Sequence, residues 1–392
     1  MPTRALLVLV SLALGRLAFG VQMQSVATLE PLLMRTFHLD YAALGTLIGV
    51  YMAPGLLAAL PAGLLARRFG DRMVVGAGLV LMTLGPCLPL LWRSTAGIDA
   101  GRLLAGLGAV TVVVLQSKIV ADWFSGSRFL AAVTVSTAAY PVGVGGSELV
   151  LPTLAARFGW EGAIATGAVI AGLGAALFLA VERPAPGHAA TRRFALPTGR
   201  ECWLATLAGM IWTTYNAGYI GFLSYVPAWL AEHHATGQAG LVMTLATWTN
   251  VPAMFLGAAL AGRIGRAPVF TTAAVILAAA TAAITLGGPA VVWATVFGLF
   301  GAMHPSIIIA AGTESARPEH RAVGMGLFYA TYYLGGAVMP GALGHAADAV
   351  GSAGGALVTA AAVSLLSIPL FFAHRRMLHR TPVLATAPAP TG

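Results

Sequence analysis

Apolar stretches of roughly twenty residues alternate with short polar breaks along the whole chain. A helix of that length crosses the ~30 Å hydrocarbon core of a bilayer, at ~1.5 Å per residue. The pattern therefore predicts an all-α polytopic membrane protein with twelve transmembrane helices. Their expected positions are near residues 5–33, 42–65, 73–92, 100–121, 129–151, 162–181, 202–230, 239–261, 269–286, 290–311, 323–344 and 353–373.

The longest polar interval, "ERPAPGHAATRRFALPTGRE", lies almost at mid-chain and separates six predicted spans from six others. It predicts two six-helix bundles joined by a linker. The expected domains are an N-terminal bundle over 1–181, a cytoplasmic linker over 182–201, a C-terminal bundle over 202–374 and a cytoplasmic tail over 375–392. An internal repeat supports this division, because "LLARRFGDR" (64–72) aligns with "ALAGRIGRA" (259–267) at an offset of 195 residues.

Composition agrees with the membrane interpretation and excludes several function classes. Of the 392 residues 58% are hydrophobic and 9% are charged, whereas soluble domains carry about 25% charged residues. The mean hydropathy is +0.83. Cys87 and Cys202 offer neither a disulfide framework nor a zinc spacing. The sequence has no phosphate-binding Gly-x4-Gly-Lys-Ser/Thr loop, and no acid–base pair stands at membrane depth. We therefore expect no enzyme activity, cofactor or bound metal.

The arginines indicate the topology. With the N-terminus inside, sixteen arginines fall in predicted cytoplasmic segments and only Arg35, Arg93 and Arg157 in outer loops. This satisfies the positive-inside rule, so both termini are expected in the cytoplasm and the protein in a bacterial inner membrane. The net charge of +9 then reflects topology and anionic lipid headgroups, and no nucleic-acid partner is expected.

Four motifs resemble those of one transporter family in order and spacing. "GLLARRFGDR" (63–72) is similar to the family's signature between helices 2 and 3. "GRLLAGLGA" (101–109) resembles its helix-4 motif, "ARFGWEGA" (156–163) its entry into helix 6, and "PEHRAVGMGLFYATYYLGGAVMP" (318–340) its loop 10–11 and helix 11. The family is the major facilitator superfamily of secondary transporters, with a loose likeness to its cyanate-permease-like and small-anion branches.

The resemblance implies alternating access by rocking of two bundles around a central cavity lined mainly by helices 1, 4, 7 and 10. It also implies a cytoplasmic gate at the loop between helices 2 and 3, formed by Gly63, Arg67, Arg68, Gly70, Asp71 and Arg72. Arg67 stands where the family has an acid, and the acid has moved to Asp71. The residues themselves suggest that Arg67 and Arg68 face the negative end of helix 2, that Asp71 faces the positive end of helix 3, and that Gly70 permits the turn. A purely topological anchor is the alternative.

Two cations inside apolar runs suggest the sign of the substrate. Arg16 lies about eleven residues into the first helix, and Lys118 is the only lysine in a chain with 21 arginines. Of the acids, only Glu30 and Glu148 stand within helices away from loops, and both are near outer ends. A cavity with cations and no carboxylate favours a small organic or inorganic anion. The alternatives are a structural role for Arg16, and a Lys118 that reaches to the cytoplasmic headgroups.

Further polar and aromatic residues complete the predicted substrate site. They are Gln22, Gln24, Tyr140, Tyr215, Asn216, Tyr219, His304, Tyr329 and Tyr332, with Tyr333 beside them. His304 is a candidate proton carrier, and the alternative for it is an interhelical hydrogen bond; the aromatic residues could equally serve packing. A proton or an exchanged anion is the expected coupling partner, and a monomer is the expected state. Rival functions are efflux of neutral or cationic amphiphiles, and sensing without transport by a protein of the same fold.

Overall fold

The computed structural model describes residues 3–124, 127–182, 197–317 and 320–379, apart from some side chains within helices, including those of Arg67 and Lys118. Every regular element in these ranges is helical. The elements are α1 Thr3–Thr28, α2 Glu30–Phe37, α3 Tyr41–Val50, α4 Pro54–Phe69, α5 Asp71–Leu84, the 3₁₀ turn η1 Gly85–Cys87, α6 Leu88–Leu91, α7 Thr95–Trp123, α8 Ser127–Val181, α9 Gly199–Glu232, α10 Thr236–Trp248, α11 Asn250–Ile264, α12 Arg266–Thr285, α13 Ala290–Gly301, α14 Pro305–Glu314, α15 Arg321–Val350, α16 Ala353–Leu365 and α17 Ser367–His379.

These elements form the twelve predicted helices. Several spans consist of two consecutive elements, such as α3 with α4 and α13 with α14, whereas α8 contains two spans joined at Gly159 (φ 73°, ψ 176°). Nine segments of the described chain are long and apolar enough to cross a membrane, and one of them, over Val135–Val181, has 47 residues, enough for two crossings. The prediction of an all-helical membrane protein is confirmed.

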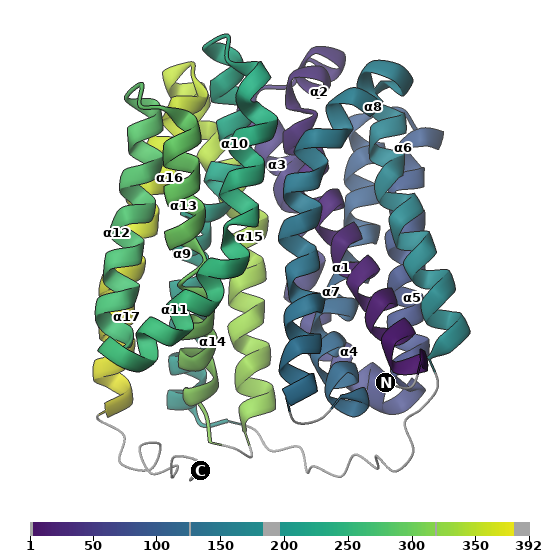
Figure 1. Cartoon of the computed structure of the whole chain (residues 1–392), viewed down its shortest axis with the longest axis vertical. Helices are drawn as coiled ribbons and strands as arrows, with labels where there is room; N and C mark the ends of the chain where they lie inside the picture. The colour runs from purple at the N-terminus through teal and green to yellow at the C-terminus, as the bar shows by residue number, and fades with distance from the viewer. Residues whose placement is uncertain (1–2, 125–126, 183–196, 318–319, 380–392) are drawn as a thin grey trace.

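The helices divide into two groups that lie side by side (Figure 1). Elements α1–α8, drawn from purple to teal, form one bundle, and α9–α17, drawn from green to yellow, form the other. Each bundle has a buried core, with Leu12 and Phe178 fully buried in the first and Phe222 and Phe297 in the second. We call the end at which α1 begins and α17 ends the terminal face, and the opposite end the far face (Figure 1).

The internal repeat appears as a repeated backbone turn. Gly70 separates α4 from α5 with φ 84° and ψ 150°, and Gly265 separates α11 from α12 with φ 93° and ψ 156°. These two glycines stand 195 residues apart, at the offset seen in the sequence. Residues with a Cβ rarely adopt such a positive φ. The expectation that Gly70 permits the turn is confirmed, and Gly265 has the same role in the second bundle.

The bundles contact each other closely at the far face. Asp348 of α15 accepts hydrogen bonds from the backbone N–H groups of Tyr41 and Ala42 at the start of α3, each at 2.9 Å. Further along α3, a Cβ on Gly49 would lie only 2.1 Å from the carbonyl oxygen of Ala337. Small residues allow such close approach of two membrane helices. The far face is therefore closed by direct contact between α3 and α15.

Candidate functional site

A cavity of about 300 Å³ lies between the two bundles. It is large enough for a small solute, since binding pockets begin at about this size. Elements α1, α7 and α8 of the first bundle and α9, α11, α14 and α15 of the second contribute to its wall. The lining residues are Arg16, Phe19, Met52, Val113, Gln116, Thr137, Tyr140, Pro141, Trp212, Tyr215, Asn216, Tyr219, Ile220, Asn250, Met254, Ala302, Pro305, Ile309, Tyr329, Tyr332 and Tyr333.

Arg16 is the only charged side chain among the described residues of this wall. Its guanidinium carbon lies 5.6 Å from the ring centroids of both Phe19 and Tyr140, within the range of cation–π attraction. Its Nε is buried without a hydrogen-bond partner in the described chain. A buried donor of a cation that has no partner is costly, and it is free to bind an anion.

Two amide side chains in the wall each have an oxygen without a hydrogen-bond partner in the described chain. Gln116 of α7 and Asn250 of α11 are each 5% exposed, and within the described chain Oε1 of Gln116 and Oδ1 of Asn250 have no hydrogen bond. Asn250 uses its Nδ2 to donate to the hydroxyl of Tyr219. Neither amide was singled out from the sequence, although a lone amide inside an apolar run is the signal that could have indicated each of them.

The predicted aromatic residues of the second bundle do line the cavity. Tyr215 and Asn216 of α9 are there. The Tyr215 hydroxyl donates to the Gly301 carbonyl at 2.8 Å, and the Asn216 Nδ2 donates to the Trp212 carbonyl at 3.1 Å. Tyr329, Tyr332 and Tyr333 of α15 complete the wall, opposite Tyr140 of α8.

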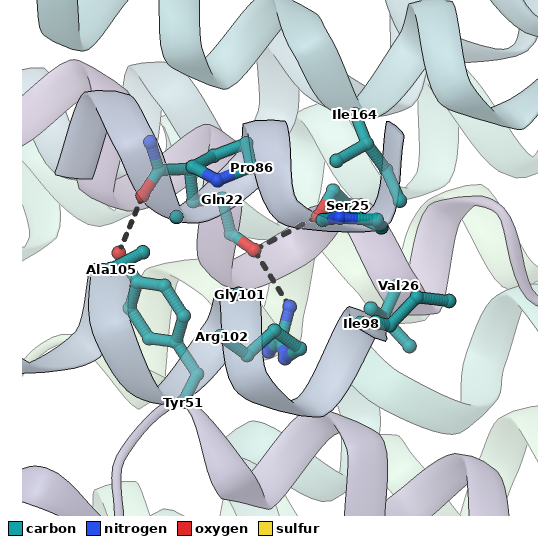
Figure 2. A pocket seen from close by; sticks show the side chains of 12 residues that line it. Gln22, Ser25, Val26, Tyr51, Pro86, Ile98, Gly101, Arg102, Ala105 and Ile164 are labelled. Atoms are coloured by element: carbon teal, nitrogen blue, oxygen red, sulfur yellow. Dashed lines mark hydrogen bonds between the residues drawn. The ribbon is translucent and has the colours of Figure 1, made fainter. Parts of the chain in front are cut away.

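Gln22, by contrast, lies outside the cavity. Its Nε2 donates to the carbonyls of Met82 at 2.8 Å and Gly167 at 3.0 Å. Its Oε1 accepts from the Tyr51 hydroxyl at 2.9 Å (Figure 2). All polar atoms of this amide are used within the first bundle. The void beside it has a volume of about 20 Å³, room for no more than a water molecule.

Arg102 of α7 borders the same void and was not singled out from the sequence, although it stands in the quoted helix-4 motif. Its guanidinium donates to the backbone carbonyl of Gln22 at 3.0 Å (Figure 2) and to that of Ile48 at 2.9 Å. It also lies over the ring of Tyr51, at 5.0 Å from the centroid. Arg102 therefore ties α1 and α3 to α7 inside the first bundle.

Gln24 lies at the contact between the bundles, outside the cavity. Its Nε2 donates both to Oε1 of Glu148 on α8 and to the carbonyl of Leu223 on α9, each at 2.8 Å. Thr28 donates to the same Glu148 oxygen at 2.7 Å. Glu148 is 5% exposed, so this buried carboxylate fixes the amide that bridges the two bundles.

His304 is fully buried behind the wall and does not line the cavity. Its Nδ1 lies 3.0 Å from the Gly301 carbonyl oxygen, and its ring stacks on Tyr215 with centroids 4.7 Å apart. Lys118 belongs to α7, but its side chain lies outside the described residues. Its predicted contact with substrate stays a prediction.

The predicted gate loop lies at the junction of α4 and α5. Arg68 is exposed and stands over the ring of Phe69 at 5.3 Å, Asp71 begins α5 as its acidic first residue, and Arg72 donates to the Leu179 carbonyl at 2.5 Å. Gly63 belongs to α4, but neither its surroundings nor the side chain of Arg67 is described. The acid at the start of α5 fits the expected helix-dipole interaction, and the gating role stays a prediction.

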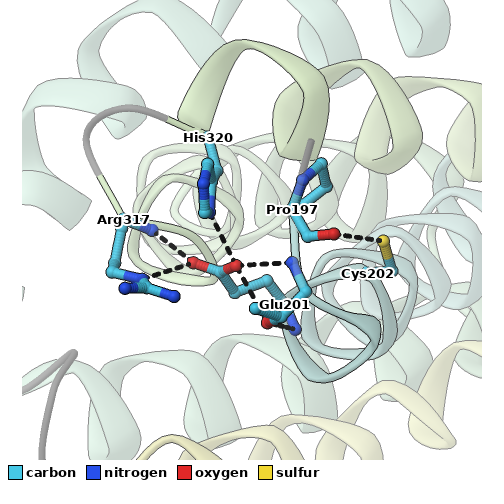
Figure 3. A network of polar contacts seen from close by, with 6 residues as sticks. Pro197, Glu201, Cys202, Arg317 and His320 are labelled. Carbon is cyan, nitrogen blue, oxygen red and sulfur yellow. Dashed lines mark hydrogen bonds and ion pairs between the residues drawn. The ribbon is translucent and has the colours of Figure 1, made fainter. Parts of the chain in front are cut away.

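A second polar cluster lies away from the cavity, where α9 begins. Thr198 and Glu201 form a reciprocal capping box, and Glu201 also accepts from the backbone N–H of Arg317 at 2.9 Å and from Nδ1 of His320 at 2.8 Å (Figure 3). Burial of this carboxyl opposes its ionisation, but the hydrogen bonds from Arg317, Thr198 and His320 outweigh burial and lower the pKa of Glu201 to about 2. The charged carboxylate thus holds the start of α9 against the segment that precedes α15.

Comparison with known proteins agrees with this architecture. The family model described as Major Facilitator Superfamily matches residues 12–236 and 202–391. The chain is 24% identical over 117 residues to an uncharacterized transporter of Buchnera aphidicola subsp. Schizaphis graminum, a match that covers 30% of this chain and 29% of that protein.

Two solved structures share the fold. One is a bacterial homologue of the human lysosomal transporter Spinster in an inward-facing and occupied conformation, with a TM-score of 0.75, 15% identity and coverage of 97% of this chain and 98% of that one. The other is a mutant of the nucleoside transporter NupG, with a TM-score of 0.74, 14% identity and coverage of 95% and 99%. At these identities the likeness concerns the fold alone.

Proposed function

Because the chain belongs to the major facilitator superfamily and is thus a secondary transporter that works by alternating access, we propose that its substrate is a small organic or inorganic anion. The observation that carries the proposal is Arg16, a cation in the cavity wall without an ion-pair partner in the described chain. The described lining contains no aspartate or glutamate. A cationic substrate would meet repulsion there, whereas an anion would supply the missing partner.

The proposed orientation places the terminal face in the cytoplasm of a bacterial cell, as the arginine distribution predicts. The contacts between α3 and α15 then close the cavity toward the outside, which supports an inward-facing state. Transport would be driven by the anion gradient, by exchange with another anion or by coupled protons. We expect the monomer to be the transporting unit, with Lys118 as a second contact on the cytoplasmic side.

Efflux of neutral or cationic amphiphiles is the second candidate, and one observation favours it. Six tyrosines of the described chain line the cavity and present aromatic surface: Tyr140, Tyr215, Tyr219, Tyr329, Tyr332 and Tyr333. Such a surface suits flat apolar molecules and can attract cations through ring faces. The charge of Arg16 counts against the cationic members of this class.

The test compares ligand classes on the purified full-length protein. Thermal shift and equilibrium binding would be measured with acetate, lactate, malate, nitrate and phosphate, and with tetraphenylphosphonium and ethidium as cations. We expect an anion to bind and Arg16→Gln to weaken that binding about 30-fold, which corresponds to about 2 kcal/mol for a lost charge-assisted contact. Arg93→Gln is the matched control, because Arg93 is 72% exposed and pairs with Glu161 on the surface.

Flux separates a transporter from a sensor of the same fold. Proteoliposomes loaded with the binding anion should exchange it for labelled external anion, and Arg16→Gln should lower the apparent affinity of that exchange. Binding of cations alone, or anion binding by Arg16→Gln that equals that of the wild type, would overturn the anion proposal. Anion binding without any flux would favour the sensor.

A further inference from the structure

The geometry of the cavity points to a narrower substrate class: we propose that the transported anion is a small carboxylate that also carries a hydroxyl or amino group. This inference rests on the proposed anion function and assigns further contacts at the same site. It assigns Arg16 to the carboxylate, and Gln116 and Asn250 to the hydrogen-bond donors of the substrate.

The two amides of the cavity wall each have an oxygen without a hydrogen-bond partner in the described chain. The carbonyl oxygens of Gln116 and Asn250 are buried in the cavity wall, and neither has a hydrogen-bond partner in the described chain. Buried polar atoms are paired in the great majority of native structures, and one left unpaired costs about 1–3 kcal/mol. Two such acceptors in one wall indicate a ligand that brings donors to them.

The unpaired atoms of both amides are hydrogen-bond acceptors. The Nδ2 of Asn250 is engaged by the Tyr219 hydroxyl, so the free atom is the acceptor Oδ1. A fully deprotonated oxyanion such as nitrate or sulfate, or a carboxylate without other polar groups, has only acceptor atoms at neutral pH. Such a ligand satisfies Arg16 and leaves both amide oxygens unpaired. A hydroxyl group donates to one of these oxygens and an ammonium group can donate to both, and neither adds negative charge.

The three proposed substrate contacts come from both bundles. Arg16 of α1 and Gln116 of α7 belong to the first bundle, whereas Asn250 of α11 belongs to the second. A substrate held at both ends therefore contacts both bundles. The cavity volume of about 300 Å³ suits a molecule of a few carbon atoms. Substrate binding is in this way linked to the relative position of the bundles, which alternating access requires to change.

The experiment uses matched pairs of ligands that differ in one hydroxyl group. Affinities of the full-length protein for lactate and propionate, and for malate and succinate, would be measured by isothermal titration calorimetry at one pH and salt concentration. In the pair that fits the cavity, we expect the hydroxylated acid to bind about tenfold more tightly than its partner. This is the difference expected when one buried hydrogen bond is made instead of left unmade.

Variants then assign the contact. Asn250→Leu and Gln116→Met keep the side-chain volume and remove the free acceptor. A single hydroxyl donates one hydrogen bond, so the variant that removes its acceptor should reduce the tenfold preference to about twofold or less. Arg16→Gln should weaken both members of the pair equally and leave their ratio unchanged. Gln238→Leu changes an exposed residue of α10 and is the control. Each variant would be checked for a monodisperse elution profile before measurement.

The outcomes separate the two proposals. If anions bind and depend on Arg16, but each hydroxylated acid binds no better than its partner, the substrate class proposed here is wrong and the anion proposal stands. The class is also wrong if both Asn250→Leu and Gln116→Met, folded, keep the full preference. If no acid and no inorganic anion binds the wild-type protein, the anion proposal itself fails.

Discussion

Two arginines inside the first bundle lie over aromatic rings but differ in their hydrogen bonds. Arg102 donates to the carbonyls of Gln22 and Ile48 and stacks on Tyr51. No hydrogen bond to the Arg16 guanidinium is seen within the described chain, where its Nε is unpaired and it lies against the rings of Phe19 and Tyr140; the Nε of Arg102 is also unpaired, but its other guanidinium nitrogens are bonded. A buried charge stabilises the protein only when its surroundings compensate for lost hydration. Arg102 thus stabilises the fold of the first bundle. Arg16 lowers the stability of the unliganded protein and is available to bind a ligand.

This difference predicts opposite effects on stability. Arg102→Leu should lower the midpoint of thermal unfolding by several degrees, because it leaves buried carbonyls without their donor. Arg16→Leu should leave the midpoint unchanged or raise it, because it removes an uncompensated cation. Both would be measured in detergent without added anion. A large loss of stability in Arg16→Leu would show that Arg16 has a structural role.

At this scale the sequence predicted Arg16 and the cavity tyrosines because their chemistry is unusual within apolar helices. It could not place Gln22 and Gln24 correctly, since the rotation of a helix and the reach of a side chain depend on the neighbouring helices. Their amides found backbone carbonyls outside the cavity. Gln116 and Asn250 were missed, although they stand in apolar runs as Gln22 and Asn216 do, because the sequence does not show which amides face the cavity.

At the scale of elements, helix ends and breaks carry the information that the hydrophobic pattern lacks. The pattern predicted one helix over 5–33, whereas the structure divides it at Leu29, just before Pro31 in the first turn of α2. It predicted separate fifth and sixth helices, and the structure joins them through the single residue Gly159. The length of an apolar run predicts a membrane span. A break within or between helices depends on the local backbone conformation, and in the sequence only Gly and Pro indicate it.

The start of α9 gives a prediction for pH dependence. The pKa of Glu201 is lowered to about 2 in the folded protein, below its unfolded value of about 4.3. Its ionised form therefore contributes stability that is fully present above about pH 5 and is lost as the pH falls toward 2, with an upper bound of about 3 kcal/mol. Glu201→Gln should lower the unfolding midpoint at pH 7.

The difference between Glu201→Gln and the wild type should shrink steadily from pH 5 to pH 3. Glu314→Gln is the comparison, because Glu314 is an exposed carboxylate paired with Arg266 on the surface, where such pairs contribute little. A difference that is independent of pH across this range would mean that the charge of Glu201 is not what holds α9 to the segment before α15.

At the scale of the whole molecule, the two bundles contact each other at the far face. Gln24 contributes a buried hydrogen bond to this contact. Its Nε2 bridges Glu148 of its own bundle and the Leu223 carbonyl of the other. Opening of the far face requires these two bundles to separate there, so the hydrogen bond to Leu223 must break. The closed state therefore depends on an amide whose orientation is fixed by a buried carboxylate.

We expect Gln24→Leu to raise the population of the state open at the far face about fivefold, since one intramolecular hydrogen bond contributes about 1 kcal/mol. Spin labels at positions 35 and 349, on exposed residues in a background without Cys87 and Cys202, would report the separation of the bundles. Gln22→Leu is the control from the same helix, because its amide bonds only within the first bundle. It should lower thermal stability without changing the distance distribution. Identical distributions for Gln24→Leu and the wild type would show that closure depends on the contacts of Asp348 and the packing of α3 against α15 instead.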